Sequence, residues 1–362
     1  MKQRMVSQDI AKGIAILTVV MLHTVLLTRE IGTPVFLLFG FGMPFFLFMS
    51  GYNYKNRGGS PWKTMITRVR MLVNTILHYS FVIFILMGVY FLIRKEATVP
   101  ELIQSYAAFL ISKWGARLIG WNLPQQLYQR LLGPYWFLQF LTTGSVLFYL
   151  CVDQALKSRA RAISMIALLS SMSCVLIELH VVLPWGIQHA PAVAAVMVLA
   201  AWLHKENALF NDSIRKVWVW INSIAGILII ALIQIKHPKA GMFGAGSLGE
   251  VMGGAEVYVL LVISVLFTYY LVSLSRLVEK IKGLSDVLAW LGRHTLPILT
   301  LHMTIMHILK DILGLPQLNA AEEAFAEKIE PRNALAYILT LLIVSGIILF
   351  QERWSKWKCG GY

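Results

Sequence analysis

The chain has 362 residues, of which 57% are hydrophobic and only 14% are charged. This composition lies outside the range of soluble domains and is typical of polytopic membrane proteins. The net charge of +14 does not require a nucleic-acid partner, because the basic residues fall in short segments between apolar runs, where they set membrane topology. The three cysteines, Cys151, Cys174 and Cys359, lack paired or metal-type spacing. Neither a disulfide framework nor a zinc site is therefore predicted.

Ten apolar segments have lengths close to what a bilayer demands, which predicts an all-α polytopic membrane protein with about ten transmembrane helices. No segment has the composition of a soluble domain, so we expect a single transmembrane domain over residues 1–362 with no fused soluble domain. The predicted spans are roughly 8–28, 33–54, 71–94, 134–152, 162–182, 190–204, 217–236, 255–274, 287–310 and 333–352.

The distribution of Lys and Arg predicts that both termini are cytoplasmic. With the N-terminus inside, the inner segments hold 19 basic residues and the outer segments hold 11, as the positive-inside rule requires. The longest piece between spans, 95–133, falls on the outer face. Its apolar residues recur at helical spacing, which predicts an interfacial amphipathic helix. These residues are Leu102, Tyr106, Phe109, Leu110 and Trp114.

The first span carries three polar residues, Asp9, Lys12 and His23, on or near one stripe of a helix. Polar side chains are costly in hydrocarbon, so this stripe must face protein or a water-filled cavity. Taken singly, His23 is explained as a core histidine hydrogen-bonded to a neighbouring helix, and Asp9 and Lys12 as a helix end among lipid headgroups. Their combination and spacing favour a functional site.

Two features mark the cytoplasmic side of the next spans. Ser50 and Tyr52 end the second span, where a helix-packing face with an interfacial tyrosine is the simpler interpretation. Arg68 and Arg70 stand at the inner mouth of the third span. They are either an ordinary topology signal or an anion clamp, because guanidinium groups match the geometry of phosphate.

Three further candidates lie in later spans. Trp136 opens the fourth span, where an interfacial aromatic belt also explains it. Glu178 falls inside the predicted fifth span, and an intramembrane carboxylate is a functional candidate by default. His302 lies in the ninth span at a depth similar to that of His23, so the two histidines could line one cavity. A metal site from His23, His302 and Glu178 is the weaker interpretation, because no two of them share a span at ligand spacing. We expect no metal.

Five motifs in this order resemble the signature of the acyltransferase 3 family, integral membrane acyltransferases that act on cell-surface glycans and related acceptors. The first is Lys12-x10-His23, with Asp9 before it and Gly13 after the lysine. The others are P-F-F-x-x-x-S-G-Y, Arg68, the Trp136-Phe137-Leu138 trio and L-G-x-x-T-L-x-x-x-x-x-H, which ends at His302. The chain departs from the pattern at Lys12, where many relatives have arginine, and after the arginines, where the usual proline is absent.

The resemblance implies an acyl-CoA donor that enters from the cytoplasm, with His23 as the essential catalytic residue and Lys12 and Arg68 near the donor. Transfer from a thioester to a hydroxyl needs a base, and histidine is the default base near neutral pH. The acceptor would approach from the outer side, past Trp136 and the loop around Trp185 and His189. The expected catalytic residues are His23, Asp9 and His302; the donor-binding residues are Lys12, Arg68, Arg70, Ser50 and Tyr52; and the acceptor-binding residues are Trp136 and Glu178.

We therefore expect an acyl-CoA-dependent O-acyltransferase of the bacterial cytoplasmic membrane. Its donor would be acetyl-CoA or another short acyl-CoA, and its acceptor a glycan or lipid-linked sugar, with no nucleic-acid partner. The alternative is a transporter or exporter of a small solute or glycan, since Pro44 and Pro297 within spans would suit broken helices. Inverted repeats would favour transport, and the sequence shows none.

Overall fold

The computed structural model describes residues 6–23, 42–55, 60–111, 135–181, 183–206, 256–315 and 331–359. All regular structure within these ranges is helical, which confirms the predicted all-α class for this part of the chain. The chain divides into two compact units, the first formed by Met1–Gly40 with Ser275–Tyr362 and the second by Phe41–Leu274. Each unit is described by itself.

Seven helices in the described ranges are long and apolar enough to cross a membrane. They are Pro61–Ile93, Trp136–Ala155, Arg159–Glu178, Pro184–Lys205, Val257–Val278, Thr295–Leu313 and Pro331–Ser355. The predicted span 217–236 lies outside the described residues, as does the first part of the predicted span 33–54. The chain is therefore a multi-pass, helical membrane protein.

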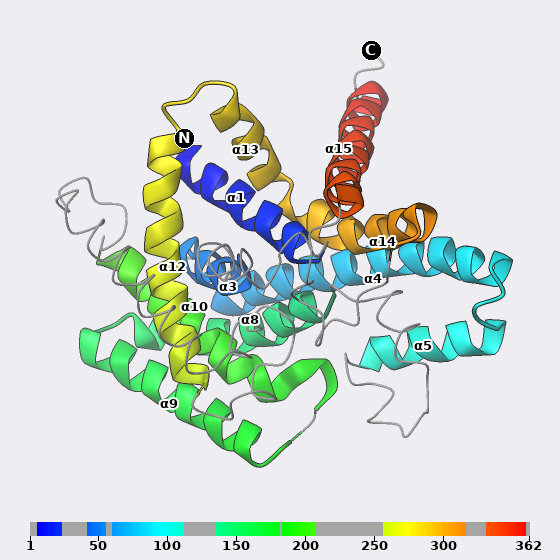
Figure 1. The fold of residues 1–362 in the computed structure, drawn as a ribbon. Coiled ribbons are helices and arrows are strands. Elements are labelled where there is room, and N and C mark those ends of the chain that lie inside the picture. The colour runs from blue at the N-terminus through cyan, green and yellow to red at the C-terminus, as the bar shows by residue number, and fades with distance from the viewer. Residues whose placement is uncertain are drawn as a thin grey trace. The chain divides into compact units, whose positions relative to one another are not determined.

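The first unit contains α1 (Val6–Leu22), α13 (Leu284–Arg293), α14 (Thr295–Leu313) and α15 (Pro331–Cys359). Helix α1 lies along α13, and α14 packs on α15; the first pair runs side by side in Figure 1. The buried residues of α13 include Ser285, Leu288, Ala289 and Gly292. Their spacing forms one apolar stripe of a helix, which explains why this short segment packs against a neighbour.

The prediction of one continuous span over 287–310 is wrong, because the chain forms two helices that meet at His294. His294 leaves helical geometry with φ −111° and ψ 22°, and α14 begins at the next residue. Pro297 is the third residue of α14. Proline is tolerated in a first turn, where the backbone N–H has no intrahelical partner. The proline therefore belongs to a helix start and not to a kink within one long span.

Helices α1 and α13 approach closely because each presents a glycine at the crossing. A Cβ atom on Gly292 would overlap the carbonyl oxygen of Asp9, and a Cβ on Gly13 would overlap the carbonyl oxygen of Leu288. Small residues permit backbones to approach in this way in membrane proteins. The glycines of the first and last sequence motifs thus have a packing role.

The second unit is built around α10 (Ala190–Lys205), which contacts α3 (Gly42–Tyr52), α8 (Trp136–Ala155) and α9 (Arg159–Glu178). Eleven of the sixteen residues of α10 are buried, so the shortest predicted span is the core of this unit. The short helix η2 (Pro184–His189) precedes α10, and α12 (Glu256–Val278) follows later in the chain.

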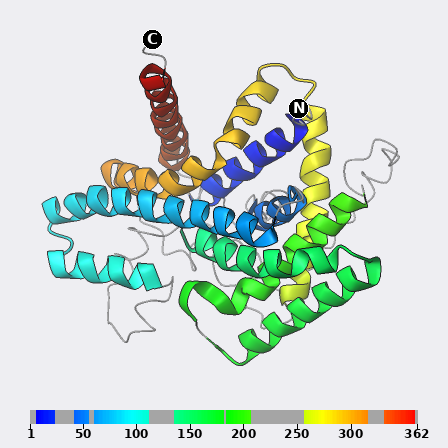
Figure 2. The same cartoon turned by 180° about the vertical axis from the view of Figure 1, so that it is seen from behind.

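The predicted amphipathic segment forms α5 (Val99–Ile111), which packs against α4 (Pro61–Ile93); the two lie next to each other in Figure 2. Thr98 and Glu101 form a capping box at its start. The Thr98 backbone N–H donates to the Glu101 carboxylate at 2.8 Å, and the Thr98 hydroxyl donates to the same oxygen at 2.7 Å. The helix is confirmed, whereas Trp114 of the predicted pattern lies outside the described residues.

Candidate active site

The first unit brings together the two histidines that the sequence placed at similar depth. His23 directly follows the end of α1, and His302 lies in α14. Their ring centroids are 5.4 Å apart, with the ring planes tilted by 40°. His302 is fully buried. The two histidines are therefore neighbours within this unit, as one shared cavity would require.

The hydrogen bond of His302 identifies which of its nitrogens is available for chemistry. Its Nδ1 lies 3.0 Å from the carbonyl oxygen of Ile298. Because a carbonyl only accepts, Nδ1 carries the proton, and Nε2 is left with a lone pair. This Nε2 is buried and has no hydrogen-bond partner among the described residues. An unsatisfied buried acceptor costs about 1–3 kcal/mol, and such groups are candidates for a catalytic role.

Two further polar residues of α14, His307 and Lys310, belong to the same cluster. Both are buried, and both interact electrostatically with His23. The Lys310 Nζ donates to the carbonyl oxygen of His23 at 3.2 Å. The predicted span 287–310 ends at Lys310, whereas α14 continues to Leu313, so Lys310 lies within the helix. The available signal was the helical continuation from His302, because positions 307 and 310 are three residues apart on one face.

The opposite end of α1 holds a separate pair of charges. Lys12 Nζ lies 3.8 Å from Asp9 Oδ1, and the Asp9 side chain is buried. Asp9 and His23 are fourteen positions apart along α1 and its end, which is about 21 Å along the helix axis. The polar stripe of the first span therefore comprises two sites, and Asp9 lies outside the histidine cluster.

The arginines of α4 point in different directions. Arg68 is half-buried and interacts electrostatically with Tyr149 of α8, whereas Arg70 is exposed. Two residues apart on a helix are about 200° apart around its axis. The two guanidinium groups therefore do not share a face of the helix, and Arg68 is the one directed toward the interior of its unit.

A tyrosine–carboxylate pair that sequence reasoning missed joins the end of α3 to the end of α8. The Tyr54 hydroxyl donates to Asp153 Oδ1 at 2.6 Å. The Tyr54 ring also packs against the rings of Phe148 and Tyr149, at centroid distances of 5.4 Å and 5.8 Å. Burial, followed by the interaction with Asp153, raises the pKa of Tyr54 above its ordinary value. Tyr149 thus lies next to both Tyr54 and Arg68.

The remaining residues expected near the donor have the contacts of a packed helix. The Ser50 hydroxyl donates to the carbonyl oxygen of Phe46 at 2.9 Å. Tyr52 is buried, and its ring meets that of His204 edge-on at a centroid distance of 4.5 Å. Gly51 between them lies against the backbone of Met197 in α10. These contacts agree with the simpler interpretation of this motif as a packing face.

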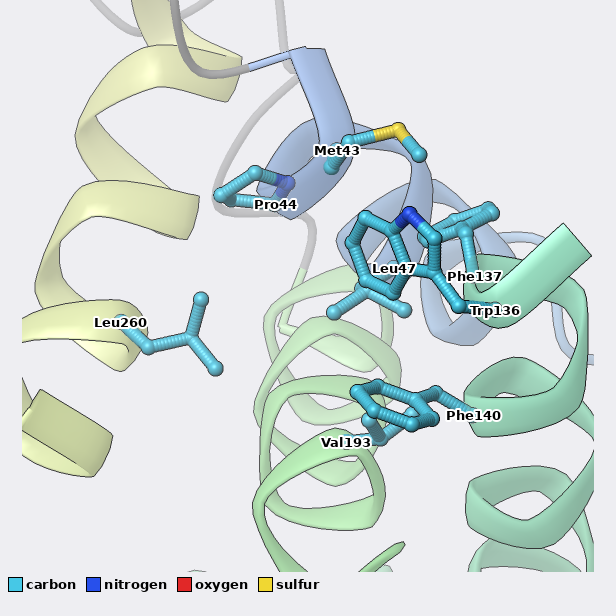
Figure 3. Close-up of a pocket in the computed structure, with 8 residues that line it drawn as sticks. All are labelled: Met43, Pro44, Leu47, Trp136, Phe137, Phe140, Val193 and Leu260. Carbon is cyan, nitrogen blue, oxygen red and sulfur yellow. The ribbon is translucent and has the colours of Figure 1, made fainter. Parts of the chain in front are cut away.

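Trp136 lines an apolar pocket in the second unit, shown in Figure 3. The ring of Phe140 packs against the rings of both Trp136 and His189, at centroid distances of 5.4 Å and 5.0 Å. The pocket is lined by Met43, Pro44, Leu47, Trp136, Phe137, Phe140, Val193 and Leu260.

The predicted position of Glu178 requires a correction. It was expected well inside the fifth span, but α9 ends at Glu178 and the side chain is exposed. A carboxylate at the end of a helix avoids the cost of burial in hydrocarbon. In the described part of the chain, no three His, Cys, Asp or Glu side chains are grouped as metal ligands would be.

Comparison with known proteins decides the family. The sequence model of the acyltransferase 3 family, described as an acyltransferase domain, matches residues 6–351. The chain belongs to the acyltransferase 3 family. The resemblance inferred from the five motifs is thereby confirmed, and membership supports acyl transfer at a membrane. No curated protein and no solved structure matches the chain.

Proposed function

We propose that this protein transfers a short acyl group, acetyl in the first instance, from cytoplasmic acyl-CoA to a hydroxyl group of a cell-surface glycan or lipid-linked sugar. The proposed location is the bacterial cytoplasmic membrane. The observation that carries the proposal is the pairing of His23 with the buried His302, with ring centroids 5.4 Å apart, in a chain of the acyltransferase 3 family.

His23 acts as the general base in this proposal. It takes the proton of the acceptor hydroxyl while the oxygen attacks the thioester carbonyl carbon, giving a tetrahedral intermediate. The C–S bond then breaks, the new ester forms, and His23 returns the proton to the departing CoA sulfur. The balance is one thioester and one alcohol consumed, with one ester and one thiol produced. No metal or redox cofactor is required.

His302 orients a reacting group in this proposal. Its Nδ1–H is engaged with the Ile298 carbonyl, so it offers only the Nε2 lone pair. A lone pair accepts a hydrogen bond, which suits the acceptor hydroxyl or an N–H of the neighbouring imidazole. Such an orienting partner is a common companion of a general base.

Lys12 and Arg68 are the cations that we assign to the phosphates of CoA, and Asp9 holds Lys12 by the ion pair at 3.8 Å. Guanidinium and ammonium groups bind phosphate through charge-assisted hydrogen bonds. On the acceptor side, we assign Trp136 to the apolar face of a sugar ring and Glu178 to sugar hydroxyls. Ser50, Tyr52 and Arg70 are assigned supporting roles around the donor.

The test is an acyl-transfer assay on the purified protein with acetyl-CoA. It is combined with mass spectrometry of surface glycans from cells with and without the protein. A mass increase of one acetyl group on a glycan, present only with the active protein, is the expected result. Glycans of identical mass in both strains, with no acetyl-CoA consumed by the purified protein, would refute the proposal.

A further inference from the structure

Lys310 is completely buried and lies in a helix that is long and apolar enough to span a membrane. Its relative exposure is 0%, and α14 is apolar enough to cross the bilayer. An ammonium group in such a position is costly and is retained only with compensating contacts. One of these contacts is the hydrogen bond from Nζ to the His23 carbonyl oxygen at 3.2 Å.

The accepting carbonyl stands at the C-terminal end of α1. The helix ends at Leu22, and the His23 backbone N–H closes the last turn with the carbonyl of Val20 at 3.2 Å. The last carbonyls of a helix have no intrahelical donor, and the negative end of the helix dipole attracts cations there. Lys310 therefore caps α1 at the residue that carries the imidazole.

The same helix supplies the partner imidazole of His23. His302 and Lys310 are eight residues apart in α14, about 12 Å along its axis. Fixing the His23 main chain leaves only its two side-chain torsions to set the ring position. Helix α14 thus holds His23 in two ways, through the backbone by Lys310 and against the ring by His302.

We propose that Lys310 is a positioning residue for the catalytic His23, acting through the hydrogen bond to its carbonyl oxygen. The proposal rests on the function proposed above, in which His23 is the base. A displacement of about 1 Å in a reacting group is enough to lower the rate of an enzyme by about a hundredfold. Loss of the cap is therefore expected to reduce turnover without changing donor affinity.

The first test compares K310M, K310R and K205M in the purified, full-length protein. Methionine preserves the length of the side chain and removes the donor, whereas arginine restores a cationic donor. Lys205 is the matched control, because its Nζ donates at 2.6 Å to the carbonyl of Leu156, the C-cap of α8, in the other unit. We expect K310M to lower kcat about tenfold or more, with unchanged KM and Kd for acetyl-CoA. K310R should recover much of kcat, and K205M should retain it.

The second test does not depend on activity. Cysteines are introduced at positions 23 and 302 in a background whose three native cysteines are serine, and oxidative cross-linking is measured with and without K310M. We expect ready cross-linking when Lys310 is present and a yield reduced severalfold by K310M. A reduced yield in the cysteine variant, combined with no acyl transfer by the parent protein that keeps both histidines, would support the positioning role while refuting the proposed function. A K310M protein with the parent cross-linking yield would overturn the positioning role, as would a folded K310M enzyme with the parent kcat.

Discussion

His23 and His302 differ in which of their atoms are held by hydrogen bonds, a ring nitrogen in His302 and the backbone carbonyl in His23. His302 has a fixed tautomer, since its Nδ1–H is committed to a carbonyl of its own helix. His23 lies beyond the last turn of α1, with its backbone tied to Lys310. A fixed tautomer suits an orienting acceptor, whereas the group that takes and returns a proton must exchange it with the substrates.

This difference predicts unequal effects of removing the two rings. H23A is expected to lower acyl transfer by 10²–10⁴-fold, the typical cost of losing a positioned general base, and H302A by a smaller factor. Membrane insertion of both variants should persist, because an apolar replacement is favoured within the membrane. The measurement is the acetyl-transfer rate at saturating acetyl-CoA, with acetyl-CoA binding as the control. A folded H23A protein that transfers at the parent rate would exclude the base role.

The positions of the two arginines of α4 predict different effects on donor binding. R68A is expected to weaken acetyl-CoA binding about tenfold to a hundredfold, since a charge-assisted contact is worth roughly 1.5–3 kcal/mol. R70A should have a smaller effect, because Arg70 is exposed on another side of the helix. Dissociation constants of the two purified variants provide the comparison. Equal losses would show that net charge at this end of α4, rather than Arg68 itself, attracts the donor.

Sequence reasoning selected His23 and His302 as candidates that could line one cavity, because polar residues in an apolar run must face protein or a water-filled cavity, and the structure places their rings next to each other. Sequence reasoning did not predict Lys310, because a lysine near the end of an apolar segment has the pattern of a loop residue. Only the packing of α14 against the end of α1 shows that its ammonium group is buried. Sequence reasoning also placed Asp9 near the stripe that carries His23, although the length of the helix separates the two residues by about 21 Å.

At the scale of helices, the close crossing of α1 and α13 depends on two glycines, which have no side chain. Gly13 and Gly292 each face a backbone carbonyl of the opposite helix. This crossing holds the helix that carries Asp9, Lys12 and, at its end, His23. Its integrity therefore affects both the proposed donor contact and the base.

The close packing at this crossing predicts that adding one methyl group there lowers the stability of the protein substantially. G292A is expected to destabilise the protein by about 1–3 kcal/mol or more, the usual cost of forcing extra atoms into a packed interface. The matched control is G346A in α15, where an added Cβ meets no atom of the described residues within 4 Å. Alanine there should be neutral or stabilising by up to about 1 kcal/mol, because it favours the helix. Thermal unfolding in detergent measures the melting temperatures of both variants. Equal melting temperatures for G292A and G346A would refute the close-packing account.

The capping box of α5 predicts a pH-dependent contribution to stability. The backbone N–H and hydroxyl of Thr98 lower the pKa of Glu101 below its ordinary value. Because the folded pKa is depressed, the contribution is complete above the ordinary pKa and is lost as the pH falls through the folded pKa. The protein should therefore melt higher than E101Q at pH 6, with the difference diminishing toward pH 3. A difference between the two proteins that is independent of pH would exclude the ionised cap.

At the scale of the whole chain, the lengths of the apolar segments predicted the helical class and most of the helices in the described ranges, but not where they break. The ninth predicted span divides at His294, because hydropathy averages over a window and does not detect a change of direction between two apolar helices. The amphipathic α13 and the apolar α14 are distinct elements with different main partners, α1 for α13 and α15 for α14. The number of membrane crossings therefore cannot be read from apolar length alone, and it requires a measurement of sidedness.

The topology predicts opposite sides of the membrane for the two turns that flank α5 and α8. The turn between α4 and α5 should face outward, and the turn between α8 and α9 should face the cytoplasm, because basic residues concentrate in the inner segments. Both turns offer exposed positions, Glu96 and Lys157. A single cysteine replaces each in turn, in a background whose three native cysteines are serine.

An impermeant thiol reagent added to intact cells is expected to label the cysteine at position 96 and not that at position 157, with both labelled after the membrane is opened. Labelling at position 157 alone in intact cells would invert the predicted orientation. Labelling of both from outside would mean that the chain does not cross the membrane an odd number of times between them. The inverted orientation would also move the proposed donor-binding arginine, Arg68, away from the cytoplasmic supply of acyl-CoA, because Arg68 lies near the start of α4 and position 96 just after its end. The sidedness of these two turns therefore bears directly on the proposed reaction.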